Sequence, residues 1–169
     1  MVLPDGGEGV FIPRRDTTSV LNALAGGRLF PGRHHLGRFE VEERGEHYAI
    51  RLKNRNGQPI LSVEADVTDQ LPEASVFGSV EEASAFFEAG SLGYSPSADG
   101  GRLDGLELRT HGWHVQPLAV RHVQSSYFED RQRFPPGSVR FDSALLMRGL
   151  QHEWHAREPL YCGEERQAV

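Results

Sequence analysis

Residues 48–67 read Tyr-Ala-Ile-Arg-Leu-Lys-Asn-Arg-Asn-Gly-Gln-Pro-Ile-Leu-Ser-Val-Glu-Ala-Asp-Val, and this stretch decides the fold. Apolar side chains alternate with other residues at Tyr48, Ile50 and Leu52, which is the period of a half-buried strand. After Pro59 the alternation returns, with one face made of Leu61, Val63 and Ala65 and the other of Ser62, Glu64 and Asp66. The Asn-Gly pair at 56–57 is a strong hairpin signal. We therefore predict an antiparallel hairpin.

Segments on both sides of this hairpin also have strand character. Phe39 and Val41 begin an alternating strand that ends at a turn over residues 43–46. Further strands are expected over residues 103–109, 114–123 and 138–147, whereas the polar, glycine-rich residues 90–102 predict a loop. Many strands joined by hairpins, together with one helix, indicate a mainly β (α+β) fold: an antiparallel sheet that curls into a cone or barrel.

The helix is predicted over residues 79–89. Ser79 and Glu82 have the spacing of a capping box, and Gly90 stands where a helix often ends. One side of this helix carries Val80, Ala83, Phe86 and Phe87 at helical spacing. We expect this stripe to pack against the core.

Composition indicates one domain and excludes several classes of protein. The 169 residues predict a single β-rich domain over residues 10–156, with tails at 1–9 and 157–169. A net charge of −6 argues against nucleic-acid binding. We expect no signal peptide and no membrane span, because no apolar run approaches the roughly 20 residues that a bilayer requires. The single cysteine, Cys162, allows no intrachain disulfide, so a cytoplasmic location is expected.

The stretch from Ala25 to Val41 concentrates candidate chemistry. Arg28, Arg33 or Arg38 can clamp a carboxylate, because a guanidinium group donates two parallel hydrogen bonds. His34 or His35 can carry a proton near neutral pH. The alternative is a solvated connection whose arginines pair with surface carboxylates.

Other candidates lie on the predicted strands. Glu64 and Glu107 could face the same interior, and Trp113 is expected in the core or in a pocket wall. Two histidine pairs are spaced three residues apart, His111 with His114 and His152 with His155, but no third ligand lies at motif spacing. We therefore expect no metal, and no phosphate- or dinucleotide-binding motif indicates a cofactor.

Several short motifs occur in an order that is typical of one superfamily. They are Gly9-Val-Phe-Ile12, Asp16, Arg28, Phe30-Pro-Gly32, the helix over 79–87, Gly93-Tyr-Ser95, His111-Gly-Trp113 and Gln116-Pro117. In this order they resemble the acetoacetate decarboxylase-like superfamily, and within it the bacterial YqjF-like branch of unknown function. The similarity covers most of residues 9–155.

The resemblance implies a β-cone or barrel around a central pocket, with Tyr94 among the ligand-binding residues. The decarboxylase itself uses a lysine just after the proline, whereas this chain has Gly32-Arg-His-His35 there. The only lysine, Lys53, lies beside the hairpin turn, so no Schiff-base chemistry is expected. The ligand is expected to be a small, anionic organic molecule.

The resemblance also implies that the N-terminal third of the usual branch is absent. The missing strands would leave an edge or an apolar face uncovered, which predicts a homodimer. Three functions stay open at this point. They are an enzyme that uses His34 or His35 as proton carrier, a protein that senses or sequesters a ligand, and a structural subunit that pairs through a sheet edge.

Overall fold

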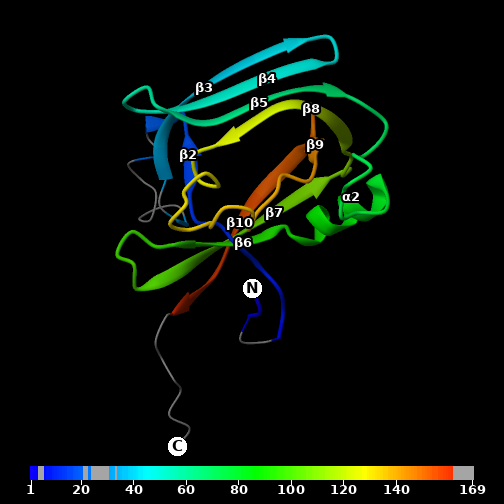
Figure 1. Cartoon of the computed structure of the whole chain (residues 1–169). Coiled ribbons are helices and arrows are strands. Elements are labelled where there is room, and N and C mark those ends of the chain that lie inside the picture. Colours follow the sequence, from blue (N-terminus) through cyan, green and yellow to red (C-terminus); the bar gives the residue numbers. More distant parts are fainter. Residues whose placement is uncertain (4–5, 21–22, 24–30, 33, 162–169) are drawn as a thin grey trace, which may run out of the picture. The chain divides into compact units, whose positions relative to one another are not determined.

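The computed structural model describes residues 1–3, 6–20, 23, 31–32 and 34–161 (Figure 1). The described strands are β1 (Val10–Phe11), β2 (Arg15–Thr17), β3 (His34–Arg44), β4 (His47–Asn54), β5 (Pro59–Val67), β6 (Leu92–Pro96), β7 (Arg102–His111), β8 (Gln116–Ser125), β9 (Ala144–Leu146) and β10 (Gln151–Tyr161). A helix, α2, runs over Val80–Ala89. The mainly β class predicted from the sequence is confirmed. Among the described elements, none is a helix with the length and apolarity that crossing a membrane requires.

The chain forms two compact units. The first contains residues 1–36, 87–112 and 151–169, and the second contains residues 37–86 and 113–150. Each unit is built around its own sheet.

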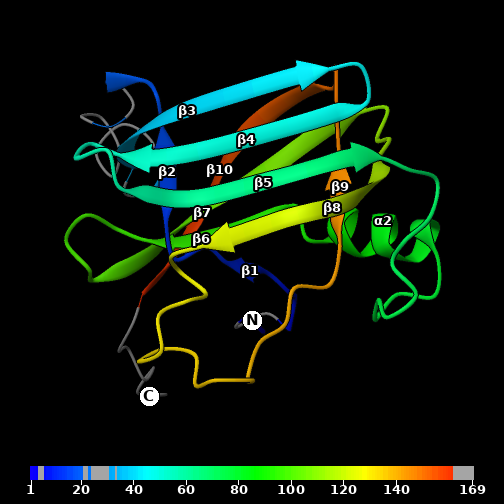
Figure 2. The ribbon, with the colours of Figure 1, turned by 45° about the horizontal axis from the view of Figure 1, so that its top comes forward.

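The second unit holds the predicted hairpin at the centre of its sheet, where β3, β4, β5, β8 and β9 lie side by side in that order (Figure 2). Neighbouring strands are antiparallel. Gly45 and Gly57 adopt φ of 62° and 78° in the two hairpin turns, a conformation that strains other residues. In the second turn the Asn54 side-chain oxygen accepts hydrogen bonds from the backbone N–H groups of Asn56 and Gln58. The hairpin over residues 48–67 is confirmed.

The core of the second unit lies on one face of this sheet. Tyr48, Ala65 and Leu118 are buried there, and Val63, Val67, Val120, Ala144 and Leu146 pack against them. This is the face that alternation predicted for β5. Glu64 and Asp66 consequently lie on the opposite face.

Two predictions about the second unit are wrong in part. The strand expected over residues 138–147 is limited to β9, because the residues after the Pro135-Pro136 turn follow an irregular path in which Asp142 binds Ser75 and the Val76 N–H. On the helix, Ala83 is fully buried, but Phe86 and Phe87 are 62% and 48% exposed.

The exposure of the two phenylalanines follows from how α2 is held. The buried side of the helix is the side of Ala83 and Ser84. The Ser84 hydroxyl accepts a 2.9 Å hydrogen bond from Trp113 Nε1. Phe86 packs on Phe77, with 5.3 Å between the ring centroids. The predicted cap is present, since Ser79 Oγ accepts from the Glu82 N–H at 3.1 Å, while Glu82 accepts from the Gly78 N–H.

The first unit is built on a four-stranded sheet in the order β1-β6-β7-β10. The parallel pair β1–β6 is followed by two antiparallel pairs. Strand β6 lies where the sequence predicted a loop. Three of its residues, Gly93, Tyr94 and Ser95, are buried, although the residues that flank them in the sequence are mostly polar. Strand β10 continues to Tyr161, so the predicted C-terminal tail is ordered over residues 157–161.

The predicted N-terminal tail is folded as well. The Met1 amino group donates to the Gly9 carbonyl at 2.7 Å, and the side chain of Leu3 is 9% exposed. Strand β2 follows and pairs in parallel with the first three residues of β3.

Candidate functional site

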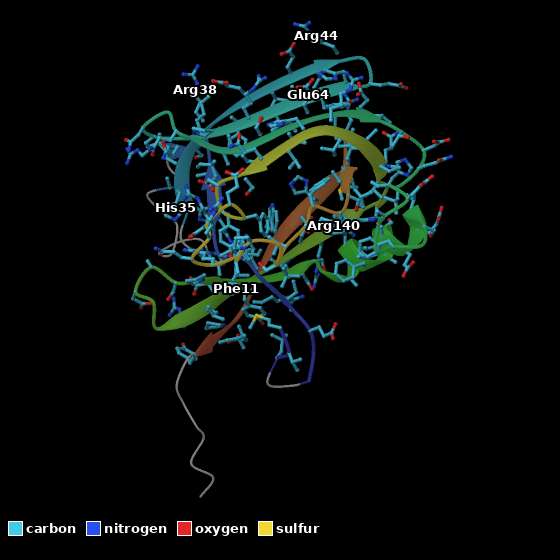
Figure 3. All side chains as sticks on the ribbon, viewed as in Figure 1. Phe11, His35, Arg38, Arg44, Glu64 and Arg140 are labelled. Atoms are coloured by element: carbon cyan, nitrogen blue, oxygen red, sulfur yellow. The ribbon has the colours of Figure 1, made fainter. Side chains whose placement is uncertain are left out.

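A pocket of about 370 Å³ lies within the first unit. Three segments line it: residues 12–15, which lead into β2; His35 at the start of β3; and residues 95–100, which form the end of β6 and the turn after it. Figure 3 labels His35 at this end of β3. Pairing of β2 with β3 joins residues 19 positions apart in sequence, and pairing of β1 with β6 joins residues 83 positions apart.

Arg15 is the most unusual side chain in the pocket. Its Nε atom donates a 2.7 Å hydrogen bond to the Ser95 hydroxyl. Its Nη2 atom is buried and has no hydrogen-bond partner in the part of the chain that the structure describes. Burial lowers the pKa of Arg15, because removal from water disfavours the charged form. A buried cationic donor without an acceptor is costly, so an acceptor that reached Nη2 would be stabilising.

The backbone around Arg15 is closely packed. A Cβ atom on Gly93 would lie 2.3 Å from Ile12 Cδ1 and 3.7 Å from Arg15 Nη2. Gly32 has a φ of 78°, and a Cβ there would lie 3.1 Å from Arg15 Nε. The two glycines therefore let the backbone approach the guanidinium group closely.

Asp104 holds Gly32 in this position. Its Oδ2 accepts the Gly32 N–H at 3.0 Å, and its Oδ1 accepts Arg102 Nε at 2.9 Å. The carboxylate is committed to these two donors. It makes no bond to Arg15 that would satisfy Nη2.

The other charged groups of the pocket are paired. Arg14 Nε and Nη2 bind the carboxylate of Asp16 at 2.8 Å, which raises the pKa of Arg14. Asp99 accepts from the Ser97 hydroxyl at 2.5 Å and from the Gly101 N–H, and these bonds lower its pKa, so it is ionised at neutral pH. The pocket thus offers one incompletely paired cation and a carboxylate.

The structure separates the two histidines proposed as proton carriers. Adjacent residues of a strand point to opposite faces, and of the two it is His35 that lines the pocket. His34 Nδ1 lies 3.1 Å from the Gly32 carbonyl oxygen. Since a carbonyl only accepts, Nδ1 carries the hydrogen in that contact.

Two further predicted ligand-binding residues of the first unit have structural roles. Tyr94 is 5% exposed, and its ring fills the space left beside Gly9 and Gly105. Glu107 binds Arg109 Nε at 2.7 Å and Arg157 Nη2 at 2.5 Å. The hydrogen bond from Arg109 contributes most to lowering the pKa of Glu107. Neither residue is among those that line the pocket.

Glu64 and Trp113 belong to the second unit. The carboxylate of Glu64 is 42% exposed and lies 3.9 Å from His47 Nε2, on the sheet face opposite the core. The Trp113 indole N–H donates a hydrogen bond to the Ser84 hydroxyl. Arg28 and Arg33 lie outside the described residues. Within residues 1–3, 6–20, 23, 31–32 and 34–161, no three histidine, cysteine or acidic side chains gather as a metal site would require.

Most of the pocket was not predicted from the sequence. Arg15 lies in a segment for which no element was predicted, and Ser95, Ser97 and Asp99 lie in the predicted loop over residues 90–102. One signal was present in Gly93-Tyr-Ser95, where a large aromatic residue between two small ones fits a strand that is packed on one face and closely approached on the other. Comparison with protein-family models, with curated proteins and with solved structures finds no match to this chain.

Proposed function

We propose that the pocket of the first unit binds a small anionic organic molecule through Arg15. The observation that carries this proposal is the guanidinium group of Arg15, which Ser95 holds by Nε while Nη2 is buried without an acceptor among the described residues. A ligand carboxylate would supply the missing acceptor. A hydrogen bond to a charged group contributes about 1.5–3 kcal/mol.

The volume and charge of the pocket narrow the class of ligand. A pocket of about 370 Å³ accommodates a molecule of metabolite size. Asp99 is ionised and lines the same pocket, so it would repel a second or third negative charge. We therefore propose a monoanion or a zwitterion whose ammonium group faces Asp99, in preference to a polyanion such as a nucleoside triphosphate.

Any turnover of the ligand would use His35 and no lysine. His35 lines the pocket, and an imidazole can accept or donate a proton in acid–base catalysis. Lys53 Nζ donates to both carboxylate oxygens of Glu40 at 2.9 Å, and Lys53 is not among the residues that line the pocket. An acetoacetate decarboxylase-like fold remains part of the proposal. With that fold, the chain would belong to the superfamily but would lack its Schiff-base chemistry.

Titration followed by ¹⁵N-¹H NMR tests the binding proposal. The probes are pyruvate as a monoanion, alanine as a zwitterion and inorganic phosphate, each at constant ionic strength. We expect saturable shifts of the Arg15 Nε–H signal and of the Ser97 and Gly100 amide signals. Arg15→Gln should weaken binding by ten- to about a hundredfold, the equivalent of one charged hydrogen bond.

Arg133→Gln is the matched control, because it removes an arginine paired on the surface of the second unit. Binding to this variant should be unchanged. The proposal is refuted if no probe gives a saturable shift at the pocket, or if Arg15→Gln binds as well as the control.

A further inference from the structure

The outer edge of β3 is open along most of its length. Strand β2 pairs with β3 only at residues 34–36, and the described residues supply no other strand on that side. Figure 2 shows β3 as the outermost strand of the antiparallel part of this sheet. Open edges carry unpaired backbone donors and acceptors, which makes them sites of strand addition.

The register shows which backbone groups face outward. The Glu46 carbonyl accepts a hydrogen bond from the Val67 N–H, and the Asn54 N–H donates one to the Gln58 carbonyl. The backbone N–H and C=O groups of even-numbered residues in and next to β4 therefore face β5. Odd-numbered residues of β4 therefore bond toward β3, where they oppose even-numbered residues. The N–H and C=O groups of Phe39, Val41 and Glu43 consequently point away from the sheet.

Side chains along this edge form a pattern that can match itself. One face carries the charge sequence plus, minus, minus, plus, from Arg38, Glu40, Glu42 and Arg44. Arg38 and Arg44 have side-chain exposures of 79% and 78%, and Figure 3 shows both standing away from the sheet. The other face carries Phe39 and Val41, which are 40% and 56% exposed.

An antiparallel second copy can pair with this edge only where outward-bonding residues oppose each other. With Glu40 opposite the partner's Glu40, Phe39 faces the partner's Val41 and Arg38 faces the partner's Glu42, and the twofold axis repeats both contacts. With Val41 opposite the partner's Val41, Arg38 would face the partner's Arg44, and Glu40 the partner's Glu42. Like charges directly opposite are destabilising. The second register has four like-charged pairs across the twofold axis, whereas the first has only the central pair of Glu40 residues, so the first register is preferred.

The ends of the edge agree with the same register. Pairing runs from Gly37 to Glu43, and it stops at one end where β2 occupies β3 and at the other where the chain turns at Gly45. A third register is shifted from the first by two residues in the opposite direction and sets Phe39 opposite the partner's Phe39. In this register the partner strand would press against β2, and fewer residues would pair.

The central pair of glutamates is neutralised within each copy. Lys53 Nζ binds both oxygens of Glu40 at 2.9 Å, and Arg38 Nε lies 3.7 Å from one of them. The glutamates therefore meet as parts of ion pairs.

We propose that two copies of this chain associate through antiparallel pairing of β3 with the partner's β3, centred on Glu40, so that one sheet continues across both copies. The occupant of the edge is a second copy because the charge pattern complements itself under a twofold axis. This proposal is independent of ligand binding in the first unit.

Charge exchange tests the proposal. Light scattering at 10–200 μM should give twice the monomer mass of 18.8 kDa for the wild type. Arg38→Glu and Glu42→Arg, each alone, place like charges opposite each other and should weaken association at least tenfold. The double variant restores opposite charges across the axis and should regain association.

Glu64→Arg is the matched control, because Glu64 lies on the same charged sheet face but on β5, away from the edge. It should associate like the wild type, and circular dichroism verifies that every variant is folded. Hydrogen exchange gives a second readout, in which the Phe39 and Val41 amides become protected as concentration rises. A monomeric wild type at 200 μM, a dimer with unprotected Val41, or a double variant that stays monomeric would each overturn the proposal.

Discussion

Replacing Asp104 should destabilise the first unit strongly, because one carboxylate satisfies two donors. Asp104→Ala leaves the buried Gly32 N–H without an acceptor, which costs about 1–3 kcal/mol. It also removes the pair with Arg102, whose side chain is 39% exposed, so solvent screens that pair and its loss adds little. The free energy of unfolding should fall by about 1–3 kcal/mol, which corresponds to roughly 2–12 °C in Tm.

Asp104→Asn separates the two contributions. The amide oxygen can still accept the Gly32 N–H, while the charge that Arg102 binds is lost. We expect this variant to lose much less than Asp104→Ala, because only the exposed pair with Arg102 is weakened.

Urea unfolding followed by fluorescence gives the measurement. In a Trp113→Phe background the only tryptophan is Trp154, which pairs with Leu108 on the strand that carries Asp104. Both Asp104 variants are compared with this background. A loss below 1 kcal/mol for Asp104→Ala, or equal losses for the two variants, would show that the Gly32 N–H does not depend on this carboxylate.

Three further predictions concern packing, helix capping and pH. Gly105→Ala places a Cβ 2.8 Å from the buried Tyr94 ring and should lower the free energy of unfolding, measured in urea, by about 1–3 kcal/mol. Gly101→Ala is the control, because its Cβ meets nothing nearer than 3.8 Å, and it should be close to neutral. Equal effects of the two substitutions would contradict the packing argument. Ser79→Ala removes the acceptor for the Glu82 N–H and should lower the free energy of unfolding by about 1 kcal/mol; an unchanged value would exclude a role for this cap. The hydrogen bond from the Ser75 hydroxyl lowers the pKa of Asp142 below its ordinary 3.8, so its stabilisation is present above pH 3.8 and is lost as pH falls through the lowered pKa. Asp142→Asn should therefore flatten the decline of stability between pH 4 and 2, and an NMR titration midpoint of Asp142 at or above 3.8 would refute this.

Local signals in the sequence determined the elements that depend on local physics. The Asn-Gly turn and the alternation on either side of it specify the hairpin, since turn geometry and side-chain period act over neighbouring residues. The Ser79 cap and the core face of β5 follow for the same reason. The concentration of arginine and histidine in residues 25–41 directed attention to the segment that contains His35, which lines the pocket.

Tertiary structure decided the rest, because it depends on pairing between distant segments. Strand β6 has a polar, glycine-rich sequence and forms because β1 and β7 supply its backbone partners. Phe86 has the helical position of a core residue, yet it is exposed because the helix is approached one turn earlier, at Ala83. Arg15 is an ordinary surface-type residue in the sequence. Only the packing of Gly32, Gly93 and Ser95 around it buries its Nη2 atom without an acceptor, and no local pattern records that environment.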